Sequence, residues 1–339
     1  MGKSARDIVQ TIKKENDAKP ASKDKKKKKI GVDIPTGKAS WKLPTGILSL
    51  DRILGGGIPG GTIVQVYGPE GAGKTTLSYH ISASALGAGL ETVLIPLETY
   101  SAEHATSIGV DVNSDNWVVW RTDNGEDTLD VLSELLRNSD AKVFIVDSIG
   151  GLTPDDNAIG AKARLISRFL DKNNIVLRTR EAILIVVNHL RIDMSGSSFM
   201  AYEKPIGGRA LQYYTDLKIR MNKHDVDKVN ARHISDVIVQ KAKFDDVTPH
   251  GTTEFDVCHL TGIDKTKDLL RVCVESNILE KSGAWYNYGT ELRWQGLSKV
   301  ADYVLEHPEF EEELKVKYLA ESIVSIEQNQ DDEVDESDG

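Results

Sequence analysis

A glycine-rich loop between a predicted strand and a predicted helix constrains the fold of this chain more than any other feature. Residues 68–76 read Gly-Pro-Glu-Gly-Ala-Gly-Lys-Thr-Thr, which fits the phosphate-loop pattern G-x-x-x-x-G-K-[ST]. A β-branched run at 62–67 predicts the strand, and apolar residues at helical spacing over 76–86 predict the helix. In that setting backbone N–H groups surround phosphate oxygens, and the helix N-terminus adds partial positive charge. The chain is therefore predicted to have an α/β fold and to bind a nucleotide.

The loop pattern also predicts individual roles. Lys74 is expected to reach the β- and γ-phosphates, and the Thr75 hydroxyl is expected to ligate Mg²⁺. The alternative, a chance match in a glycine-rich turn, is disfavoured because both flanking patterns are correct. The residues predicted to bind the nucleotide are Gly68, Pro69, Glu70, Gly71, Ala72, Gly73, Lys74, Thr75 and Thr76.

Three polar residues follow short apolar runs that predict further buried strands. Asp147 follows Val-Phe-Ile-Val and is expected to hold Mg²⁺ through water. Glu98 follows Leu-Ile-Pro-Leu and is expected to act as general base on the attacking water, the alternative being a surface glutamate at a strand end. His189 ends a third run, where it is expected to sense the γ-phosphate, although a structural histidine is the rival interpretation.

The charge is distributed unevenly. Of the net charge of −10, seven acidic residues and no basic ones lie in residues 327–339, which suits a solvated tail or one that competes with nucleic acid. A lysine run at 23–29 predicts a solvated or loosely DNA-attracting linker. The absence of an apolar run of about 20 residues or of a signal core indicates no membrane association and a cytoplasmic protein, in a bacterial cell or a phage-infected host.

The chain is expected to divide into four parts. Residues 1–34 contain a capped helix at 4–15 and the basic linker; the helix has an apolar stripe that needs a neighbouring surface, which indicates a role in oligomerisation. Alternating strands and helices over 35–261 predict a mostly parallel sheet flanked by helices. Residues 262–325 form a small C-terminal α/β domain, with a hairpin turning at 288–290, and 326–339 form an acidic disordered tail.

Several segments together resemble the RecA family of homologous-recombination proteins, in its bacterial or its phage (UvsX-like) form. The resemblance covers roughly residues 44–308 and implies a RecA-type phosphate-loop ATPase core. Its last segment lies beyond the ATPase core and is the most specific. The segments are Thr45–Asp51, Gly68–Thr76, Gly109–Asp111, Val146–Pro154, Gly207–Leu211 and Gly283–Tyr288.

This resemblance implies further site residues. Lys241 and Lys243 match two lysines that reach a neighbour's ATP across a filament interface, and Tyr213 matches an aromatic at the subunit contact. His104 stands where the family has an aromatic that stacks on adenine, and Ser101 replaces an acid there. His189 stands where the bacterial family has glutamine; phage recombinases of the UvsX type and ring helicases have histidine there, which indicates a phage origin.

Two segments predicted to be irregular, 155–168 and 191–206, match the family's two DNA-binding loops. The alternative is a mobile surface loop. Ile159 and Met194 match apolar side chains that wedge between bases; Arg164, Arg191 and Arg209 are candidates for phosphate contacts, and Gly207 and Gly208 for backbone contacts to phosphate.

The sequence thus predicts a DNA-dependent ATPase that uses ATP and Mg²⁺. Its expected function is DNA strand exchange, in a helical filament on single-stranded DNA that pairs with homologous double-stranded DNA. One alternative is a ring-forming replicative helicase, which lacks the segment at 283–288 and its domain. Another is a weakly hydrolysing DNA-binding paralogue, against which the intact Lys74, Thr75, Glu98 and Asp147 argue.

Overall fold

The structure, a computed structural model, describes residues 3–16, 40–156, 158–193 and 202–335. The chain forms two compact units. The first comprises residues 1–46 and 50–263, and the second comprises residues 47–49 and 264–339. Among the described residues, no helix is both long and apolar enough to cross a membrane.

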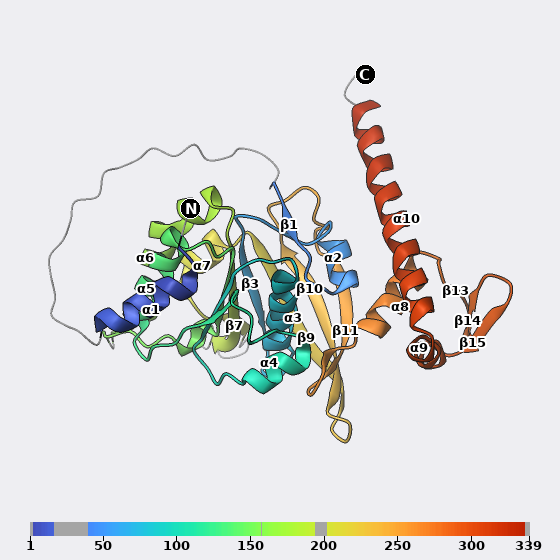
Figure 1. The fold of residues 1–339 in the computed structure, drawn as a ribbon, viewed down its shortest axis with the longest axis horizontal. Helices are drawn as coiled ribbons and strands as arrows, with labels where there is room; N and C mark the ends of the chain where they lie inside the picture. Colours follow the sequence, from blue (N-terminus) through green and yellow to red (C-terminus); the bar gives the residue numbers. More distant parts are fainter. Residues whose placement is uncertain (1–2, 17–39, 157, 194–201, 336–339) are drawn as a thin grey trace. The chain divides into compact units, whose positions relative to one another are not determined.

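A ten-stranded sheet forms the centre of the first unit (Figure 1). Strands β5, β4, β6, β7, β3 and β9 lie side by side and pair in parallel, and β10, β11 and β12 extend the sheet in antiparallel fashion. Strands β3, β4 and β6 are buried along their whole length because helices cover both faces of the sheet there. Strand β9, at the junction with the antiparallel part, alternates between buried and partly exposed residues over its first half. The nine strands of this order are β3 Ile63–Gly68, β4 Thr92–Pro96, β5 Trp117–Val119, β6 Val143–Asp147, β7 Ile183–Asp193, β9 Leu217–Asp227, β10 Arg232–Lys241, β11 Thr252–Cys258 and β12 Gly262–Ile263. The tenth strand that the structure describes, β8, pairs with β7 alone. The strands predicted at 62–67 and at the apolar runs before Glu98, Asp147 and His189 are confirmed.

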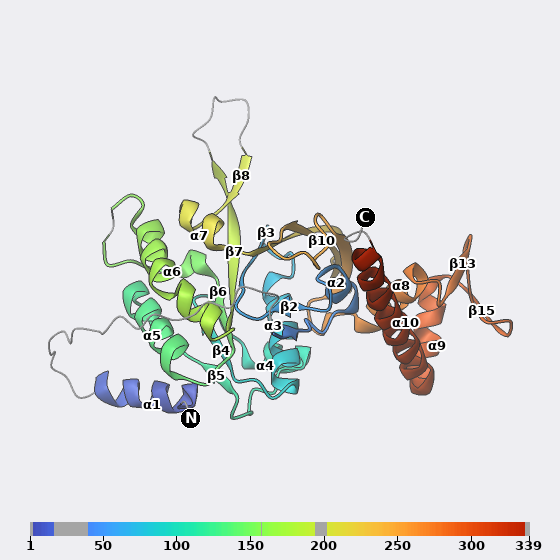
Figure 2. The same cartoon turned by 90° about the horizontal axis from the view of Figure 1, so that it is seen from above.

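Helices cover both faces of this sheet, as Figure 2 shows. Helices α5 (Gly125–Asn138) and α6 (Ala161–Thr179) pack on one face, and α3 (Lys74–Gly87) packs on the other. In α5, leucines at 129, 132 and 136 follow the 3.6-residue period and are buried, which explains its orientation. The remaining elements of this unit are β1 Lys42–Leu43, β2 Ile58–Pro59, α4 Ala102–Ile108, the 3-10 helix Ile149–Gly151, β8 Tyr202–Pro205 and α7 Gly208–Tyr214; α2 spans Leu48–Ile53.

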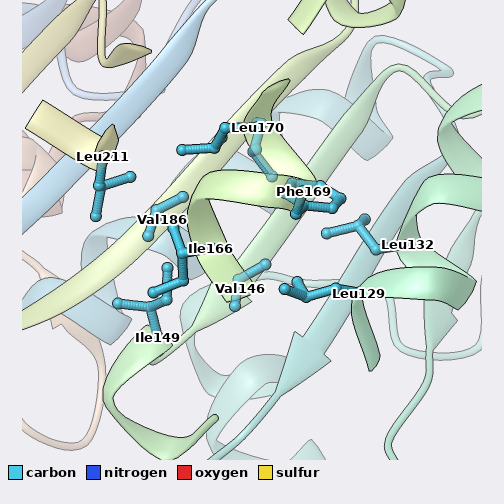
Figure 3. Close-up of a pocket in the computed structure, with 10 residues that line it drawn as sticks. Leu129, Leu132, Val146, Ile149, Ile166, Phe169, Leu170, Val186 and Leu211 are labelled. Atoms are coloured by element: carbon cyan, nitrogen blue, oxygen red, sulfur yellow. The ribbon is translucent and has the colours of Figure 1, made fainter. Parts of the chain in front are cut away.

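A small cavity lies within the apolar layer between the sheet and helices α5 and α6 (Figure 3). Its volume is about 10 Å³, and its lining comes from side chains such as Leu132, Phe169 and Val186. No polar side chain lines it. It is therefore a packing feature of the core rather than a ligand site.

The N-terminal helix α1 spans Ala5–Asn16, as predicted. Its apolar residues Ile8 and Val9 are buried in the same core cluster as α5. The Ser4 hydroxyl and the Ala5 N–H donate to the Glu91 carboxylate at 2.8 and 2.7 Å. The stripe that the sequence assigns to a neighbouring surface therefore lies on this chain's own core. A hydrophobic stripe predicts burial, but it does not identify the partner surface.

Two segments predicted to be irregular contain regular structure. Helix α6 begins at Ala161, so the irregular part of the first segment ends at Gly160, which has a φ of +82°. In the second segment, β7 continues to Asp193 and pairs in antiparallel fashion with β8. The prediction of irregular structure over 161–168 and at both ends of 191–206 was therefore wrong. These ends are stabilised by helical and cross-strand hydrogen bonds that polar composition alone does not reveal.

The second unit has its own apolar core, which includes Leu270, Val300, Phe310 and Leu314. Tyr288 of β14 pairs with Leu292 of β15, so the predicted hairpin turn is confirmed. Helix α10 continues to Asp335, through most of the acidic segment that the sequence predicts to be disordered. Glutamate and glutamine are good helix formers, so an acidic segment can extend an existing helix. The elements are α8 Lys265–Glu275, β13 Glu280–Ser282, β14 Trp285–Tyr288, β15 Leu292–Gln295, α9 Leu297–Glu306 and α10 Pro308–Asp335.

Candidate active site

The phosphate loop connects β3 to α3, and its glycines are required by its geometry. A Cβ on Gly68 would lie 2.0 Å from the Met221 carbonyl oxygen. Gly71 and Gly73 have φ values of +68° and +81°, in the left-handed region that favours glycine. Gly73 precedes the first turn of α3 and offers no side-chain cap. The first N–H groups of α3 can therefore point at a bound phosphate.

Lys74 turns back across this loop. Its side chain is buried, with 5% exposed, and its Nζ donates to the Pro69 carbonyl at 2.7 Å. Burial lowers the pKa of Lys74, while the charge of Asp147, followed by other carboxylates, opposes the shift. The ammonium is thus held where the loop would surround phosphate oxygens.

Two carboxylates lie at the same edge of the sheet because β4 and β6 are neighbours. Pro96 pairs with Asp147 in this register, and the Leu97 N–H donates to the Asp147 carbonyl at 2.7 Å. Asp147 is only 6% exposed. Burial, followed by the charge of Glu98, raises the pKa of Asp147 to about 6, although a hydrogen bond from the Thr75 hydroxyl opposes the shift.

The contact between Thr75 and Asp147 provides a test of whether the site suits Mg²⁺. A hydroxyl and a carboxylate oxygen are hard ligands of the kind that this ion prefers. The second carboxylate, on Glu98, is half-exposed and lies beyond the strand end. The residues present therefore fit a magnesium site formed by Thr75 and Asp147.

Glu98 contacts two residues that fix its carboxylate. The Ser148 hydroxyl donates to Oε1, and His189 Nε2 lies 2.8 Å from the same oxygen. Burial tends to raise the pKa of Glu98, but the hydrogen bonds from Ser148 and His189 outweigh it and leave this pKa below its usual value. An ionised, positioned carboxylate is suited to accept a proton from water.

His189 is also connected to the end of the second predicted DNA loop. His189 on β7 pairs with Gly68 on β3, which places it beside the phosphate loop. The buried Asn188 accepts from the His189 N–H at 2.8 Å and donates from Nδ2 to the Ile206 carbonyl at 2.6 Å. The Ile206 N–H also donates to the His189 carbonyl at 3.3 Å, so His189 is linked to Ile206, directly before Gly207, both directly and through Asn188.

Two other rings lie close to His104, the residue that is predicted to stack on the base. His104 on α4 lies 5.7 Å from Tyr79 and 5.7 Å from His259, between ring centroids. Burial, then the charge of His259, lowers the pKa of His104, so its ring is neutral at pH 7. The Ser101 hydroxyl accepts from the His104 N–H at 3.1 Å and caps α4. A neutral ring is available for stacking, and Ser101 already serves as a helix cap.

The structure does not bring Lys241 and Lys243 to this chain's own loop. Lys241 Nζ donates to the Gln212 and Thr215 carbonyls, at 3.0 and 2.6 Å, beside the end of α7. Lys243 Nζ lies 2.9 Å from the buried carboxylate of Asp216. Both cations are therefore separated from the cluster of Lys74, Thr75, Glu98, Asp147 and His189.

Most of the predicted DNA-binding residues that the structure describes lie on the surface, but Gly207 is buried. Ile159 is fully exposed, and Arg164 donates to its carbonyl and pairs with Asp156 at 3.1 Å. Arg191 and Arg209 are also exposed. Gly207 and Gly208, at the start of α7, have positive φ values. Tyr213, at the other end of α7, is 75% exposed. Met194 lies outside the described residues.

The sequence does not indicate every residue of the site. It assigns no role to Ser148, which orients Glu98, or to Asn188, which contacts Ile206. A polar residue at the end of a buried apolar run was the available signal for both. Tyr79 and His259 beside His104 carried no such signal, because their proximity arises only from packing.

Replacing Asp147 is expected to stabilise the nucleotide-free protein, although it removes a predicted Mg²⁺ ligand. The pKa of Asp147 is raised from 3.8 to about 6 in the folded protein, so folding disfavours the ionised carboxylate. The contribution of Asp147 to stability is therefore greatest below pH 4 and is lost as pH rises through 6. Asp147→Asn should therefore raise the free energy of unfolding at pH 7 by up to about 2–3 kcal/mol. Urea unfolding at pH 7 and pH 4.5 measures this; equal differences at both pH values would contradict the assignment.

The strand order, the phosphate loop and the carboxylates at the adjacent strand ends define a phosphate-loop ATPase core. The family model described as the RecA N-terminal domain matches residues 26–264, and the RecA C-terminal domain matches 267–321. The chain therefore belongs to the RecA family: it is a RecA-type recombinase with a nucleotide-binding ATPase core.

Comparison with individual proteins agrees with this assignment. The chain is 33% identical to "Protein RecA" of Geobacter metallireducens over 294 residues, which cover 81% of this chain and 84% of that protein. It is 36% identical to "Protein RecA" of Syntrophus aciditrophicus over 282 residues, which cover 79% and 80%. A crystal structure of the RadB recombinase matches with a TM-score of 0.52 and 24% identity, over 65% of this chain and 98% of that chain. This last likeness concerns the fold alone.

Proposed function

We propose that the protein is a DNA-dependent ATPase that forms helical filaments on single-stranded DNA and promotes strand exchange with homologous double-stranded DNA. The observation that carries the proposal is the chain of contacts from Glu98 through His189 and Asn188 to Ile206. It links the residue expected to activate water to the base of a predicted DNA loop. Such a link allows the state of the nucleotide to bias the DNA-binding state, and the reverse.

The proposed hydrolysis reaction uses residues of one protomer first. The α3 N-terminus and Lys74 bind the phosphates, and Glu98 orients a water molecule and accepts its proton. Thr75 and Asp147 would hold Mg²⁺, which neutralises charge on the phosphate oxygens when it is bound. His104 is proposed to stack on the base. Loss of the γ-phosphate would then alter the contact between His189 and Glu98.

The reaction is proposed to need a second protomer. Lys241 and Lys243 lie away from their own phosphate loop, which supports a role at the nucleotide of a neighbour. The exposed Tyr213, beside the carbonyls that bind these lysines, suits a subunit contact. A contact that uses different surfaces on the two partners generates a helix when its rotation does not close.

DNA is proposed to lie along the two loops. The fully exposed Ile159 offers an apolar wedge, and the exposed Arg164, Arg191 and Arg209 offer phosphate contacts. The match of the RecA C-terminal domain to residues 267–321 favours a recombinase over a ring helicase. The complete set of hydrolytic side chains favours it over a weakly hydrolysing paralogue.

Single-stranded DNA is expected to stimulate ATP hydrolysis by at least about tenfold, because the DNA loop and the sensor are coupled. A steady-state ATPase assay with and without single-stranded DNA measures the effect. Glu98→Gln protein serves as the control for contaminating ATPases and should show no stimulation. Equal rates of the unaltered protein with and without DNA would contradict the proposed function.

A further inference from the structure

Three side chains with metal-binding groups lie together on the part of the sheet formed by β9, β10 and β11, which Figure 1 shows side by side. They are His224, Asp236 and Glu254, one from each strand. The strand register explains their proximity, because Asp236 pairs directly with Glu254, and His224 pairs with Ile234. One ligand atom from each residue lies within 4.8 Å of the other two.

We propose that these three residues bind a divalent transition-metal ion of the zinc class. Zn²⁺ takes nitrogen and carboxylate ligands at about 2.0–2.2 Å in tetrahedral geometry, which separates neighbouring ligand atoms by about 3.3 Å. His224 Nδ1 and Asp236 Oδ2 are 3.2 Å apart, close to this spacing. Mg²⁺ and Ca²⁺ prefer oxygen ligands alone, so the histidine selects against them.

The surroundings of His224 provide a second observation. Asp225 Oδ2 lies 3.6 Å from Nε2, on the side of the ring opposite the Asp236 contact. A metal-binding histidine usually has a carboxylate or carbonyl at its other nitrogen, which orients the ring and increases its basicity. His224 therefore has one carboxylate at each ring nitrogen, in the arrangement of a ligand with its orienting partner.

The pairing of Asp236 with Glu254 provides a third observation. Like charges directly opposite each other across an antiparallel strand pair are destabilising. A divalent cation between them would neutralise this repulsion and join three strands of one sheet. Three protein ligands also leave a fourth position open to water or to another ligand. The His224 and Asp236 side chains are partly exposed, at 39% and 48%, so an ion can enter without unfolding the sheet.

The test is calorimetric titration of the full-length, nucleotide-free protein with Zn²⁺ in excess Mg²⁺, followed by Co²⁺ titration with visible absorption. We expect one Zn²⁺ per chain and a tetrahedral Co²⁺ spectrum. His224→Ala and Glu254→Gln should each weaken binding at least about tenfold, and Zn²⁺ should raise the Tm of the unaltered protein but not of these variants. Far-UV circular dichroism without metal verifies that both variants fold.

Two controls separate this site from other possibilities. Asp256→Asn changes a carboxylate on the same face of β11 and should leave the Zn²⁺ affinity unchanged. Asp147→Asn removes the proposed Mg²⁺ ligand at the phosphate loop and should also leave it unchanged. The proposal is overturned if Zn²⁺ does not bind stoichiometrically in excess Mg²⁺, or if it binds His224→Ala as tightly as the unaltered protein.

Discussion

Lys74→Ala is expected to abolish ATP hydrolysis and ATP-dependent filaments. The Lys74 ammonium is buried beneath the loop and held by the Pro69 carbonyl, so it is positioned before any phosphate arrives. Removing a positioned charge that stabilises the transition state costs about 10²–10³ in kcat, and the loss of nucleotide affinity adds to it. Steady-state hydrolysis and negative-stain microscopy with ATP and single-stranded DNA measure the two effects.

The matched control is Lys228→Ala, which removes an exposed lysine from the turn between β9 and β10. This variant should hydrolyse ATP at the rate of the unaltered protein. Because burial already lowers the pKa of Lys74, its replacement by alanine should leave the protein folded, which a thermal unfolding curve verifies. Intact ATP-dependent filaments of Lys74→Ala would refute the assigned role of the phosphate loop.

Lys241→Ala is expected to lower hydrolysis about 10²-fold or more, although this lysine contacts only the carbonyls of Gln212 and Thr215 in its own chain. The reason is that its proposed target is the γ-phosphate bound by a neighbouring protomer. Nucleotide binding to a dilute, isolated protomer should be unaffected, as fluorescence titration with a labelled ATP analogue would show. An equal loss of nucleotide affinity in the isolated protomer would place Lys241 in its own site and contradict the account.

The sequence predicts that the proposed hydrolytic residues lie close together, for a simple reason. Buried parallel strands appear as continuous apolar runs, and their carboxyl ends meet at one edge of the sheet. Glu98, Asp147 and His189 follow such runs, so their proximity to the phosphate loop could be expected. The structure confirms this arrangement through the pairing of Gly68 with His189 and of Pro96 with Asp147.

Contacts between distant segments could not be predicted from the sequence. The hydrogen bonds of Ser148 to Glu98 and of Asn188 to Ile206 depend on strand register and loop path, which no local pattern encodes. The docking of α1 on α5 is similar, because an apolar stripe does not identify its partner. The three ligands of the proposed metal site are separated along the chain by 12 and 18 positions, and they meet only through the pairing of β9, β10 and β11.

The most direct test of the central claim, a nucleotide site shared between protomers, is a mixing titration of Glu98→Gln with Lys241→Ala protein. In random filaments of an equal mixture, about one quarter of the interfaces combine an intact Glu98 with a neighbour's intact Lys241, so about a quarter of the normal rate should return. Mixing Glu98→Gln with Lys74→Ala is the control and should give no recovery, because those residues belong to one protomer. Recovery to about a quarter in the first mixture alone is the predicted result, and no recovery in either mixture would contradict the shared site.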